Sequence, residues 1–417
     1  MSQTMIIIGA GEAGVRAART LRQHNSEIAI HLFEGEQGLP YERPPLSKNA
    51  LLDDAFSRKL IISAEELAQL SIHYHSDTCV EALLAETKQI RLTNGKLFGF
   101  DKLLIATGAK ARTLPLLQQK GLDQHPLLFS LRSAADCQRI RNQASAGQHV
   151  VLVGAGFIGL ELAASLRSKG LKVTVLESQA RILQRAVPAP IAEVLAQSHA
   201  EHGVDIRLNC QIEDIRLNNE VEIDLAGQTS LKADWLVVGI GAEPNIHLAN
   251  HAGLALENGI QVDAAMQTSH PDIFAAGDVC NFLLSRYGTQ VRLESWRCAQ
   301  EQAEVAALNM LGGAVQYVQA PWFWSDQYDL GLQSVGLSIN PVTKIERRYD
   351  EQTRLYIELD SQQRILCACA IGLGNSVAKD IKVIERLINQ NSIVDITTLG
   401  DVNVPLKSLL KRAKECV

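Results

Sequence analysis

The sequence predicts an α/β protein with two parallel-sheet units and a C-terminal α+β domain. Three observations carry this prediction. A strand, a glycine-rich turn, a helix and a second strand occupy residues 5–34, and the same pattern recurs over residues 150–177. Beyond residue 319 the apolar pattern changes to the alternation that is typical of antiparallel strands. A length of 417 residues with 46% apolar residues allows about three domains with substantial cores.

The first unit begins with a short buried strand, MIII, at residues 5–8. GAGEAG at 9–14 supplies a tight turn before an Ala/Arg/Leu-rich helix at 15–23. IAIHLFE at 28–34 is the second strand, which completes a β–turn–α–β unit.

The second unit, VVLVGAGFIGLELAASLRSKGLKVTVLE, repeats this order with the same spacing. Each unit also has a matching later strand. DKLLIATGAKAR at 101–112 ends in a tight Ala-Thr-Gly turn, and DWLVVGIGAEPN at 234–245 has a parallel ending. The repeat therefore indicates two copies of one fold, about 145 residues apart.

The rest of the chain is expected to form one further strand, a long helix and the C-terminal domain. IFAAGDV at 273–279 is a strand and turn, and its acid, Asp278, stands where a helix should begin. A helix is predicted over 294–311, and PWFWSDQY at 321–328 breaks the pattern. Antiparallel strands are expected in TRLYIELD and RILCACAIG, and helices near 377–390 and 405–414. The predicted domains are 1–112 with 243–318 (discontinuous), 113–242, and 319–417.

Composition narrows the class of protein. A formal net charge of −6 argues against a nucleic-acid binder and against docking on anionic lipid. No window approaches the roughly 20 apolar residues of a membrane span, and the N-terminus lacks the features of a secretory signal. Eight cysteines are too few for a disulfide framework, so a cytoplasmic protein is expected. The His-Tyr-His stretch at 73–75 has no cluster of further ligands, so no metal site is predicted.

The first glycine fingerprint consists of Gly9, Gly11 and Gly14, followed by Glu34 at the end of the next strand. The three glycines permit a tight turn, close backbone approach to a pyrophosphate, and close packing of helix on strand. The helix N-terminus offers free N–H groups and the positive end of its dipole to the phosphates. Glu34 lies 20 residues after Gly14, where a carboxylate accepts hydrogen bonds from a ribose diol.

The second fingerprint consists of Gly154, Gly156 and Gly159, with Glu177 at the end of its strand. A carboxylate at this place binds two ribose hydroxyls and repels a 2′-phosphate, which favours NADH over NADPH. Two arginines, Arg181 and Arg185, lie near enough in sequence to hold a 2′-phosphate, the pyrophosphate or a surface acid. The two fingerprints together predict two bound dinucleotides.

Two such units, with Ala-Thr-Gly between them and Gly-Asp near residue 278, make the chain similar to the glutathione-reductase-like family of two-dinucleotide flavoproteins. The resemblance implies that FAD binds the first unit and NAD(H) the second. It adds these residues to the FAD site: Ala13, Ala106, Thr107, Gly108, Asp278 and Trp296. It adds these residues to the nicotinamide dinucleotide site: Ile158, Arg185 and Gly241.

Cysteines distinguish the branches of this family. Its members carry a redox pair after the second FAD strand, a CxxC in the NAD domain, or a single cysteine near residue 40. This chain has no cysteine at those places, and its closest pair is Cys367 and Cys369. We therefore expect no internal thiol relay and expect the cysteines to be small buried hydrophobic residues.

The stretch that replaces the redox cysteine, YERPPLSK at 41–48, carries a closer resemblance. Together with LRSAAD at 131–136, ESW at 294–296 and PWFWSDQY, it resembles the ferredoxin reductases of aromatic-ring-hydroxylating dioxygenases. PWFWSDQY is the most specific of these motifs. The subgroup is the phenylpropionate dioxygenase reductases, with rubredoxin and putidaredoxin reductases as near relatives. The implied activity passes electrons from NADH through FAD to a [2Fe–2S] ferredoxin that feeds a terminal oxygenase.

This resemblance gives three residues a catalytic role. Lys48 is implied to lie near the flavin N5 atom and to pair with Glu161, which also borders the nicotinamide. A buried lysine offsets the negative charge of a reduced flavin, and an opposite charge keeps that lysine protonated. Trp324 is implied to cover the flavin face away from NADH, near the ferredoxin, while Trp322 is as well explained by core packing.

Further FAD contacts are implied along the chain. Arg43 and Pro44 are expected to line the FAD site, with Arg132 and the backbone around Val80 as additional contacts. The prolines of LPYERPPLSK fix the backbone as it passes the cofactor. Ser47 is placed to cap the turn that follows.

The implied partner is an acidic ferredoxin, and the protein is expected to be a monomer or a homodimer. The basic candidates for docking are Lys344, Arg347 and Arg348 in the C-terminal domain, and Arg58 with Lys59. Two alternatives stay open. One is reduction of a rubredoxin or of a P450-type ferredoxin, and the other is an NADH-responsive flavoprotein with a non-catalytic interaction role.

Overall fold

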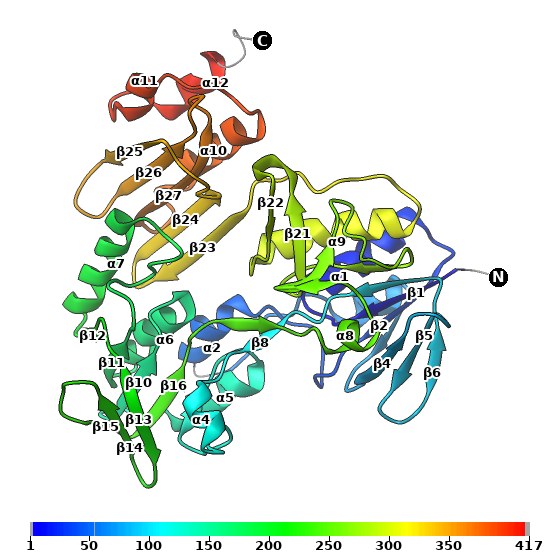
Figure 1. Ribbon diagram of the computed structural model, residues 1–417, viewed down its shortest axis with the longest axis horizontal. Helices are drawn as coiled ribbons and strands as arrows, with labels where there is room; N and C mark the ends of the chain where they lie inside the picture. Colours follow the sequence, from blue (N-terminus) through cyan, green and yellow to red (C-terminus); the bar gives the residue numbers. More distant parts are fainter. Residues whose placement is uncertain (1–2, 54, 413–417) are drawn as a thin grey trace. The chain divides into compact units, whose positions relative to one another are not determined.

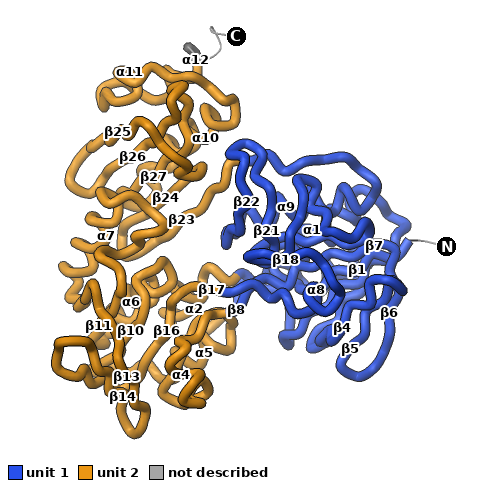
Figure 2. Tube along the Cα trace, viewed as in Figure 1, with its two compact units in different colours: residues 1–42, 58–110, 243–319 blue, residues 43–57, 111–242, 320–417 orange. Residues whose placement is uncertain are grey.

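The computed structural model describes residues 3–53 and 55–412 of the chain. Contacts divide the protein into two compact units (Figure 2). Unit 1 holds residues 1–42, 58–110 and 243–319, and unit 2 holds residues 43–57, 111–242 and 320–417. Two of the places where the chain passes between the units lie within the short strands β8 (Ala109–Ala111) and β17 (Ala242–Pro244). The three-domain division from the sequence stays a prediction.

Unit 1 is organised around a five-stranded parallel sheet with the order β20-β7-β1-β2-β3 (Figure 1). The helices α1 and α9 pack against each other beside it. Strands buried on both faces need continuous apolar runs, which MIII and LLI supply. The sheet and its helices have these bounds: β1 Thr4–Ile8, α1 Glu12–His24, β2 Ala29–Phe33, α3 Ala64–Gln69, β3 Ile72–His75, β7 Lys102–Ile105, α8 His247–His251, β20 Ile273–Ala275 and α9 Trp296–Met310.

Two smaller sheets complete unit 1. The first is β4 (Val80–Leu84), β5 (Gln89–Leu92) and β6 (Leu97–Gly99). The second is β18 (Leu256–Glu257), β19 (Gly259–Val262), β21 (Cys280–Leu284) and β22 (Thr289–Val291).

The expected helix start at Asp278 is wrong. Gly277 has a φ of +82°, and its carbonyl accepts a hydrogen bond from Cys280 N at 3.0 Å. This turn sends the chain into β21, where Cys280 pairs with Ile260 of β19. The next helix is α9, whose N-cap residue Ser295 accepts a hydrogen bond from Cys298 N.

Unit 2 contains the second parallel sheet, with the order β12-β11-β10-β16-β9. Its central strands β10 and β16 are apolar apart from His149 at the start of β10, and Trp235 of β16 is completely buried. Its elements have these bounds: α2 Asn49–Leu52, α4 Pro115–Gln119, β9 Leu128–Phe129, α5 Ala134–Gln143, β10 His149–Val153, α6 Phe157–Ser168, β11 Lys172–Leu176, α7 Ala189–Glu201, β12 Asp205–Arg207 and β16 Trp235–Val238. The predicted α/β class with its repeated unit is confirmed.

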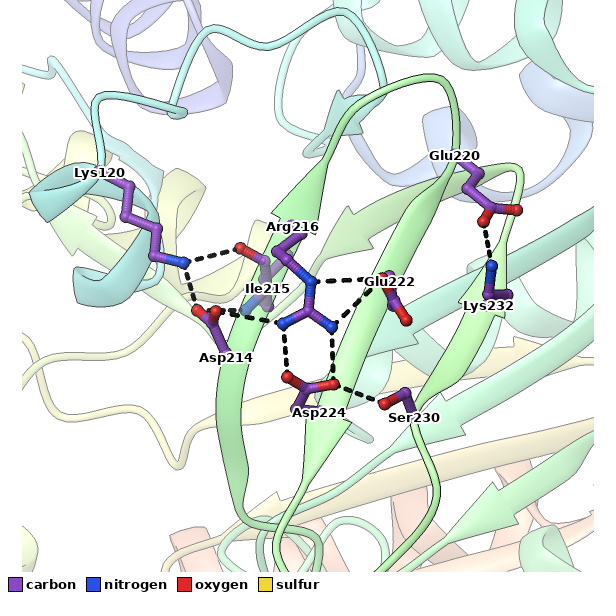
Figure 3. Close-up of polar contacts among 9 residues, drawn as sticks. All are labelled: Lys120, Asp214, Ile215, Arg216, Glu220, Glu222, Asp224, Ser230 and Lys232. Atoms are coloured by element: carbon purple, nitrogen blue, oxygen red, sulfur yellow. Dashed lines mark hydrogen bonds and ion pairs between the residues drawn. The ribbon is translucent and has the colours of Figure 1, made fainter.

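A three-stranded antiparallel sheet in unit 2 carries a network of ion pairs. It consists of β13 (Ile212–Leu217), β14 (Val221–Leu225) and β15 (Leu231–Ala233). Figure 3 shows Arg216 donating to both carboxylate oxygens of Asp224, at 2.5 and 3.0 Å, with Glu222 beside it. Lys120 pairs with Asp214 in the same network. The basic side chains drawn here already have acidic partners, so this surface is not a free basic patch.

The C-terminal part of unit 2 is a five-stranded antiparallel sheet with the order β23-β24-β27-β26-β25. The apolar face of α10 packs on it, and Ile381, Ile384 and Leu387 are fully buried there. PWFWSDQY, expected to break the pattern, instead forms the edge strand β23, paired only with β24 among the described strands. The bounds are β23 Trp322–Gln327, β24 Leu330–Gly336, β25 Thr343–Arg348, β26 Arg354–Leu359, β27 Ile365–Leu373, α10 Ala378–Asn389, α11 Ile396–Gly400 and α12 Leu409–Arg412.

One docking candidate is excluded by its burial. Arg347 is 2% exposed, and its guanidinium donates to the carbonyl oxygens of Leu399, Val402 and Val404. A basic residue on a strand looks exposed from sequence alone, but the chain that follows α11 covers this one. Arg347 therefore holds the C-terminal segment in place, whereas its neighbours Lys344 and Arg348 are exposed.

Candidate functional site

The first glycine fingerprint forms the tight turn that its sequence predicts. Gly9 has a φ of +101°, and a Cβ atom there would lie 2.3 Å from the carbonyl oxygen of Ala106. A Cβ atom on Gly14 would lie 1.8 Å from the carbonyl oxygen of Gly9. A Cβ atom on Gly11 would meet no heavy atom of the described chain within 4 Å. Two glycines are thus required by packing within the protein, and the third leaves open space beside the backbone.

The end of β2 holds an acid against this turn. Glu34 accepts a hydrogen bond from Ala10 N at 2.8 Å and one from Glu36 N at 3.0 Å. The helix α1 begins at Glu12 with Gly11 as its N-cap and no side-chain cap, unlike α5, which Ser133 caps. Burial raises the pKa of the Glu12 carboxyl group, which disfavours a negative charge in this first turn. Uncapped N–H groups at a glycine turn are what a pyrophosphate requires.

The second fingerprint has nearly the same geometry in unit 2. Gly154 has a φ of +105°, and a Cβ atom on Gly159 would lie 2.1 Å from the carbonyl oxygen of Gly154. A Cβ atom on Gly156 would again meet nothing within 4 Å. Glu177 accepts hydrogen bonds from Ala155 N at 2.8 Å and Gln179 N at 2.9 Å. This turn therefore offers the same open backbone and the same fixed carboxylate.

A second turn lies against each fingerprint. In unit 1 this turn is Ala106-Thr107-Gly108, and Asn245 fixes it with two hydrogen bonds. The main-chain carbonyl of Asn245 accepts from Thr107 Oγ1 at 3.0 Å, and its side-chain amide donates to the Thr107 carbonyl at 2.8 Å. In unit 2 it is Gly239-Ile240-Gly241, where a Cβ atom on Gly154 would lie 2.5 Å from the Gly239 carbonyl oxygen. Gly241 also has a positive φ, of +104°. The two units thus share both of their glycine turns.

Unit 1 brings several further predicted residues toward the first fingerprint. A Cβ atom on Gly277, next to Asp278, would lie 3.3 Å from the Cβ of Ala13 on α1. Gln302 of α9 accepts a hydrogen bond from Gly277 N at 2.8 Å. Trp296 is the first residue of α9. Val80 lies in unit 1 at the start of β4.

The stretch YERPPLSK groups mostly with unit 2. There, side chains of α5 and α6 donate hydrogen bonds to two of its main-chain carbonyl groups. Cys137 Sγ donates to the Leu46 carbonyl at 3.3 Å, and Ser165 Oγ donates to the Ser47 carbonyl at 2.7 Å. Arg43 Nη1 donates to the Arg132 carbonyl at 2.7 Å. The turn Pro44–Ser47 is 3₁₀-helical. These contacts hold residues 43–48 next to the second fingerprint helix.

The centre of this region is the buried carboxylate of Glu161 on α6. Lys48 Nζ lies 2.9 Å from Glu161 Oε1, so the ion pair implied by the family resemblance is present. Ser47 Oγ donates to Oε2 at 2.5 Å, and Ser325 Oγ donates to Oε1 at 2.6 Å. Lys48 Nζ also lies 5.9 Å from the ring centroid of Trp324. An ammonium, two hydroxyls and an aromatic ring therefore surround one carboxylate.

The expected cap by Ser47 is wrong. The helix α2 begins after Lys48 without a side-chain cap, because the Ser47 hydroxyl is used by Glu161. Trp324 and Trp322 stack with their ring centroids 5.4 Å apart, and Trp322 packs against the apolar core of the C-terminal sheet. Ile158 and Arg185 of unit 2 are both exposed. Arg181 donates to the carbonyl groups of residues 182–184.

The cysteines of the described residues are free. Six of them are buried: Cys137, Cys210, Cys280, Cys298, Cys367 and Cys369. Burial raises the pKa of each of these thiols, to about 11 for Cys137 and to about 12 for Cys298 and Cys369. The exception to the prediction is Cys79, which is exposed. Thiols with raised pKa values are poor nucleophiles, so these buried cysteines are structural.

Comparisons with known proteins agree with this geometry. Residues 3–303 match the family model described as pyridine nucleotide-disulphide oxidoreductase, and residues 322–410 match the model described as reductase C-terminal. A chain in the crystal structure of the covalent putidaredoxin reductase–putidaredoxin complex is 33% identical, with a TM-score of 0.93 and 99% of each chain covered. This chain belongs to the ferredoxin reductase family.

Two further structures support that membership. The ferredoxin reductase for the CYP199A2 system from Rhodopseudomonas palustris is 31% identical, with a TM-score of 0.91, and the match covers 98% of this chain and 99% of that one. The structure named Fdr9 is 28% identical, with a TM-score of 0.86, and the match covers 97% and 99%. Among the described residues of the reductase, no helix has the length and apolarity needed to cross a membrane.

Ferredoxin reductases of this family use FAD and NAD(P)H, and the reductase has a fitting site for each. The open space at Gly11 and at Gly156 leaves room for a dinucleotide backbone, and each adjacent helix begins without a side-chain cap. Each fingerprint also ends in a carboxylate held by backbone N–H groups. The residues present therefore fit two dinucleotides.

The sequence did not reveal four polar residues that are linked to the reductase's Glu161 by successive hydrogen bonds. They are Ser325, Gln327, His199 and Tyr328. The only signal was that three of them fall in PWFWSDQY, which the resemblance marked as specific without giving these side chains a role. Alternation along β23 places Ser325 and Gln327 on one face, opposite to Trp324.

Proposed function

We propose that this protein is an NADH:ferredoxin reductase whose acceptor is a [2Fe–2S] ferredoxin that serves an aromatic-ring dioxygenase. Membership of the ferredoxin reductase family supports the electron-transfer class. The observation that carries the chemistry is the Glu161 site, where Lys48 stands with only 19% of its side chain exposed and an acid beside it.

We assign FAD to the first fingerprint and NADH to the second. FAD, when bound, accepts a hydride from NADH and passes electrons on singly. Gly11 and α1 hold its pyrophosphate, and Glu34 accepts the ribose hydroxyls. The further FAD residues are Ala13, Arg43, Pro44, Val80, Ala106, Thr107, Gly108, Arg132, Asp278 and Trp296. Gly156, Ile158, Gly241, Arg185 and Glu177 serve the nicotinamide dinucleotide.

The preference for NADH rests on Glu177 and Arg181. The Glu177 carboxylate is fixed at the end of β11 by two backbone N–H groups, so it stands ready for a ribose diol. The Arg181 guanidinium is turned to backbone carbonyl oxygens, which uses donors that a 2′-phosphate would need. A carboxylate at this place repels a 2′-phosphate, which favours NADH over NADPH.

Lys48 and Glu161 hold charge next to the flavin ring in this proposal. The Lys48 ammonium offsets the negative charge that hydride transfer brings to the ring. Glu161 keeps Lys48 in place. The hydroxyls of Ser47 and Ser325 donate hydrogen bonds to the buried carboxylate and so replace the water that it has lost. Trp324, within 5.9 Å of the same ammonium, covers the opposite face of the ring, where electrons leave toward the ferredoxin.

Direct exit of electrons is supported by the thiols. The cysteines buried in both units have raised pKa values, so no thiolate pair is poised for a disulfide step among the described residues. The basic residues proposed to receive an acidic ferredoxin are Arg58, Lys59, Lys344 and Arg348, all exposed.

A second candidate acceptor is a ferredoxin that serves a P450. The two most identical structures described above are putidaredoxin reductase and the reductase of the CYP199A2 system, which favours this candidate on similarity.

One experiment tests the class and separates the acceptors. The purified protein, loaded with FAD, is expected to lose its yellow absorbance with NADH and regain it on adding a [2Fe–2S] ferredoxin under anaerobic conditions. Rate constants are compared for a dioxygenase ferredoxin, a P450-type ferredoxin and a rubredoxin. Failure to bind FAD contradicts the whole proposal, and faster reoxidation by the P450-type ferredoxin replaces the first acceptor with the second.

A further inference from the structure

A line of buried polar side chains leads away from Glu161 within unit 2. Ser325 Oγ donates to Glu161 Oε1 at 2.6 Å, and Gln327 Nε2 donates to Ser325 Oγ at 3.1 Å. Gln327 Oε1 lies 2.9 Å from His199 Nε2, and Tyr328 OH lies 3.0 Å from His199 Nδ1. Ser325, Gln327 and His199 are 1%, 2% and 0% exposed.

The contacts fix the direction of every hydrogen bond in this line. Gln327 gives its amide N–H to Ser325, so its carbonyl oxygen faces His199 and must accept. His199 Nε2 therefore carries the proton, and in the neutral ring Nδ1 is then an acceptor for the Tyr328 hydroxyl. Each donor points toward Glu161, so Tyr328, His199, Gln327, Ser325 and Glu161 form one directional chain that ends on the carboxylate.

The charge state of His199 agrees with this direction. Burial lowers the pKa of His199 to about 4, with the nearby His202 contributing in the same sense. His202 stacks on the Tyr328 ring, with the ring centroids 3.7 Å apart. The imidazole is therefore neutral near pH 7, as the tautomer with its proton on Nε2 requires. A protonated ring would have no acceptor for Tyr328.

Sequence separation shows that the chain is assembled by the fold. His199 lies on α7, and Ser325 and Gln327 lie on β23, whereas Glu161 lies on α6. Buried polar groups left without partners are costly, so each member depends on the next. Removal of the Ser325 hydroxyl also leaves the Glu161 carboxylate with one hydrogen-bond donor fewer, so its orientation toward Lys48 is less constrained.

We propose that Ser325, Gln327 and His199 are positioning residues that hold the Glu161 carboxylate oriented toward Lys48, with the His199 tautomer setting the direction of the chain. The proposal rests on the proposed function for its effect on flavin reduction. The chain itself does not depend on that function and is testable without NADH or ferredoxin.

The matched control is a second buried serine in the same sheet. Ser334 of β24 is 8% exposed, and its hydroxyl donates to the Ala368 carbonyl at 3.2 Å instead of to Glu161. Ser334→Ala removes a buried hydroxyl as Ser325→Ala does. A purely structural role for Ser325 predicts the same outcome for both variants.

The first measurement is 15N NMR of the FAD-bound enzyme labelled at its histidines, with His199 assigned by loss of its signals in His199→Gln. We expect a neutral ring with its proton on Nε2 from pH 8 down to about pH 5. Ser325→Ala is expected to shift both His199 nitrogen signals, and Ser334→Ala to leave them unchanged. A proton on Nδ1, or a charged ring at pH 7, overturns the chain.

The second measurement is the rate constant of flavin reduction by NADH as a function of pH. Ser325→Ala is expected to lower it about tenfold at pH 7 and to change the shape of its pH profile. Ser325→Thr, which keeps the hydroxyl, is expected to restore most of the rate. Equal pH profiles for Ser325→Ala and Ser334→Ala overturn the positioning role. If NADH does not reduce the wild-type flavin at all, the proposed function fails, while the His199 signals still decide whether the chain exists.

Discussion

The two glycine fingerprints are nearly identical in geometry but differ in what surrounds them. Gly9 and Gly154 have φ values of +101° and +105°, and Ala10 and Ala155 donate to Glu34 and Glu177 at the same distance of 2.8 Å. The helices that follow are different. α1 carries charged side chains such as Arg16 and Arg19 that form ion pairs, whereas the first two turns of α6 are apolar except for the buried Glu161.

From this difference we infer that the shared turns serve dinucleotide binding, whereas the residues that surround them serve the chemistry. A turn that must accommodate a pyrophosphate tolerates few sequences, so both units keep it. The residues that distinguish a hydride donor's site from a flavin's site lie further along the helix, or arrive from other parts of the chain. Glu161 is two residues beyond Gly159 but takes its partners from Ser47, Lys48 and Ser325. The following predictions break or sharpen this comparison.

The largest effect is expected from a methyl group at the third glycine of each fingerprint. Gly14→Ala would place a Cβ atom 1.8 Å from the Gly9 carbonyl oxygen, so α1 must move off β1. We expect loss of FAD and a fall of roughly 3–5 kcal/mol in the free energy of unfolding. Gly159→Ala should abolish NADH binding while FAD stays bound. The flavin-to-protein absorbance ratio measures FAD binding, and titrations with NADH measure NADH binding. Retention of FAD by Gly14→Ala contradicts the assignment of FAD to the first fingerprint.

A loss of charge at Lys48 should act on chemistry without affecting binding. Lys48→Met removes the ammonium next to Glu161, and we expect flavin reduction by NADH to slow about 100-fold with FAD still bound. Lys110→Met is the control, because that lysine is 66% exposed and paired with Glu243. Stopped-flow absorbance measures the rate, and an unchanged rate in Lys48→Met removes Lys48 from the mechanism.

The middle glycines should separate ligand binding from folding. Positions 11 and 156 have room for a methyl group within the protein, so the melting temperature without ligand should not change. We expect Gly11→Ala to weaken FAD binding, and Gly156→Ala to weaken NADH binding, each about tenfold to thirtyfold. Calorimetric titration gives the affinities. A fall in melting temperature of the ligand-free protein would show that these glycines serve packing instead.

A smaller effect is expected at the acid of the second fingerprint. Glu177→Ala should narrow the preference for NADH over NADPH about tenfold, because the carboxylate that repels a 2′-phosphate is gone. The ratio of kcat/KM values for the two nucleotides is the measurement. The same change at Glu34 should leave that ratio unaltered, and an unaltered ratio in Glu177→Ala moves the selectivity elsewhere.

The smallest effect concerns acid stability, to which each unit contributes a histidine with a lowered pKa. Burial lowers the pKa of His31 to about 4, and that of His199 to about 4. The unfolded chain binds a proton near pH 6.5 and the folded one only near pH 4, so stability falls as the pH drops from 7 toward 4. At pH 5 we expect the free energy of unfolding to be lower than at pH 7 by about 2 kcal/mol because of His199, and by on the order of 1 kcal/mol because of the partly exposed His31.

Urea unfolding at pH 7 and pH 5 tests this. His199→Gln should lose more of the pH dependence than His31→Gln, because His199 has no exposed surface. Equal slopes for the two variants would show that both rings are equally solvated.

The sequence predicted what local backbone geometry demands. Positive φ values and close approaches fix Gly9, Gly154 and their neighbours, so the fingerprints and the strands beside them could be recognised from a single chain. The family resemblance supplied the pair Lys48 and Glu161, 113 positions apart. The hydroxyls of Ser47 and Ser325 and the ring of His199 could not be found in this way, because common residues in ordinary elements become partners only through tertiary packing.

Two errors have the same physical origin. Asp278 follows a strand in a context that favours a helix start, but Gly277 turns the chain into β21. Arg347 lies between two charged residues, Glu346 and Arg348, which suggests an exposed strand residue, but it shares the buried face of β25 with Ile345, and carbonyl groups from residues 399–404 accept its hydrogen bonds. In both cases a distant segment decides the outcome.

The edge strand β23 determines where two such reductases can be joined to make a chimera. Ser325 and Gln327 lie at the start of the C-terminal sheet, yet the Ser325 hydroxyl ends on Glu161 in the dinucleotide-binding part of the same unit. A chimera joined at residue 320 to import another relative's C-terminal domain therefore also imports that relative's ligands for Glu161. The junction has to fall after Tyr328 if the native carboxylate is to keep its own donors.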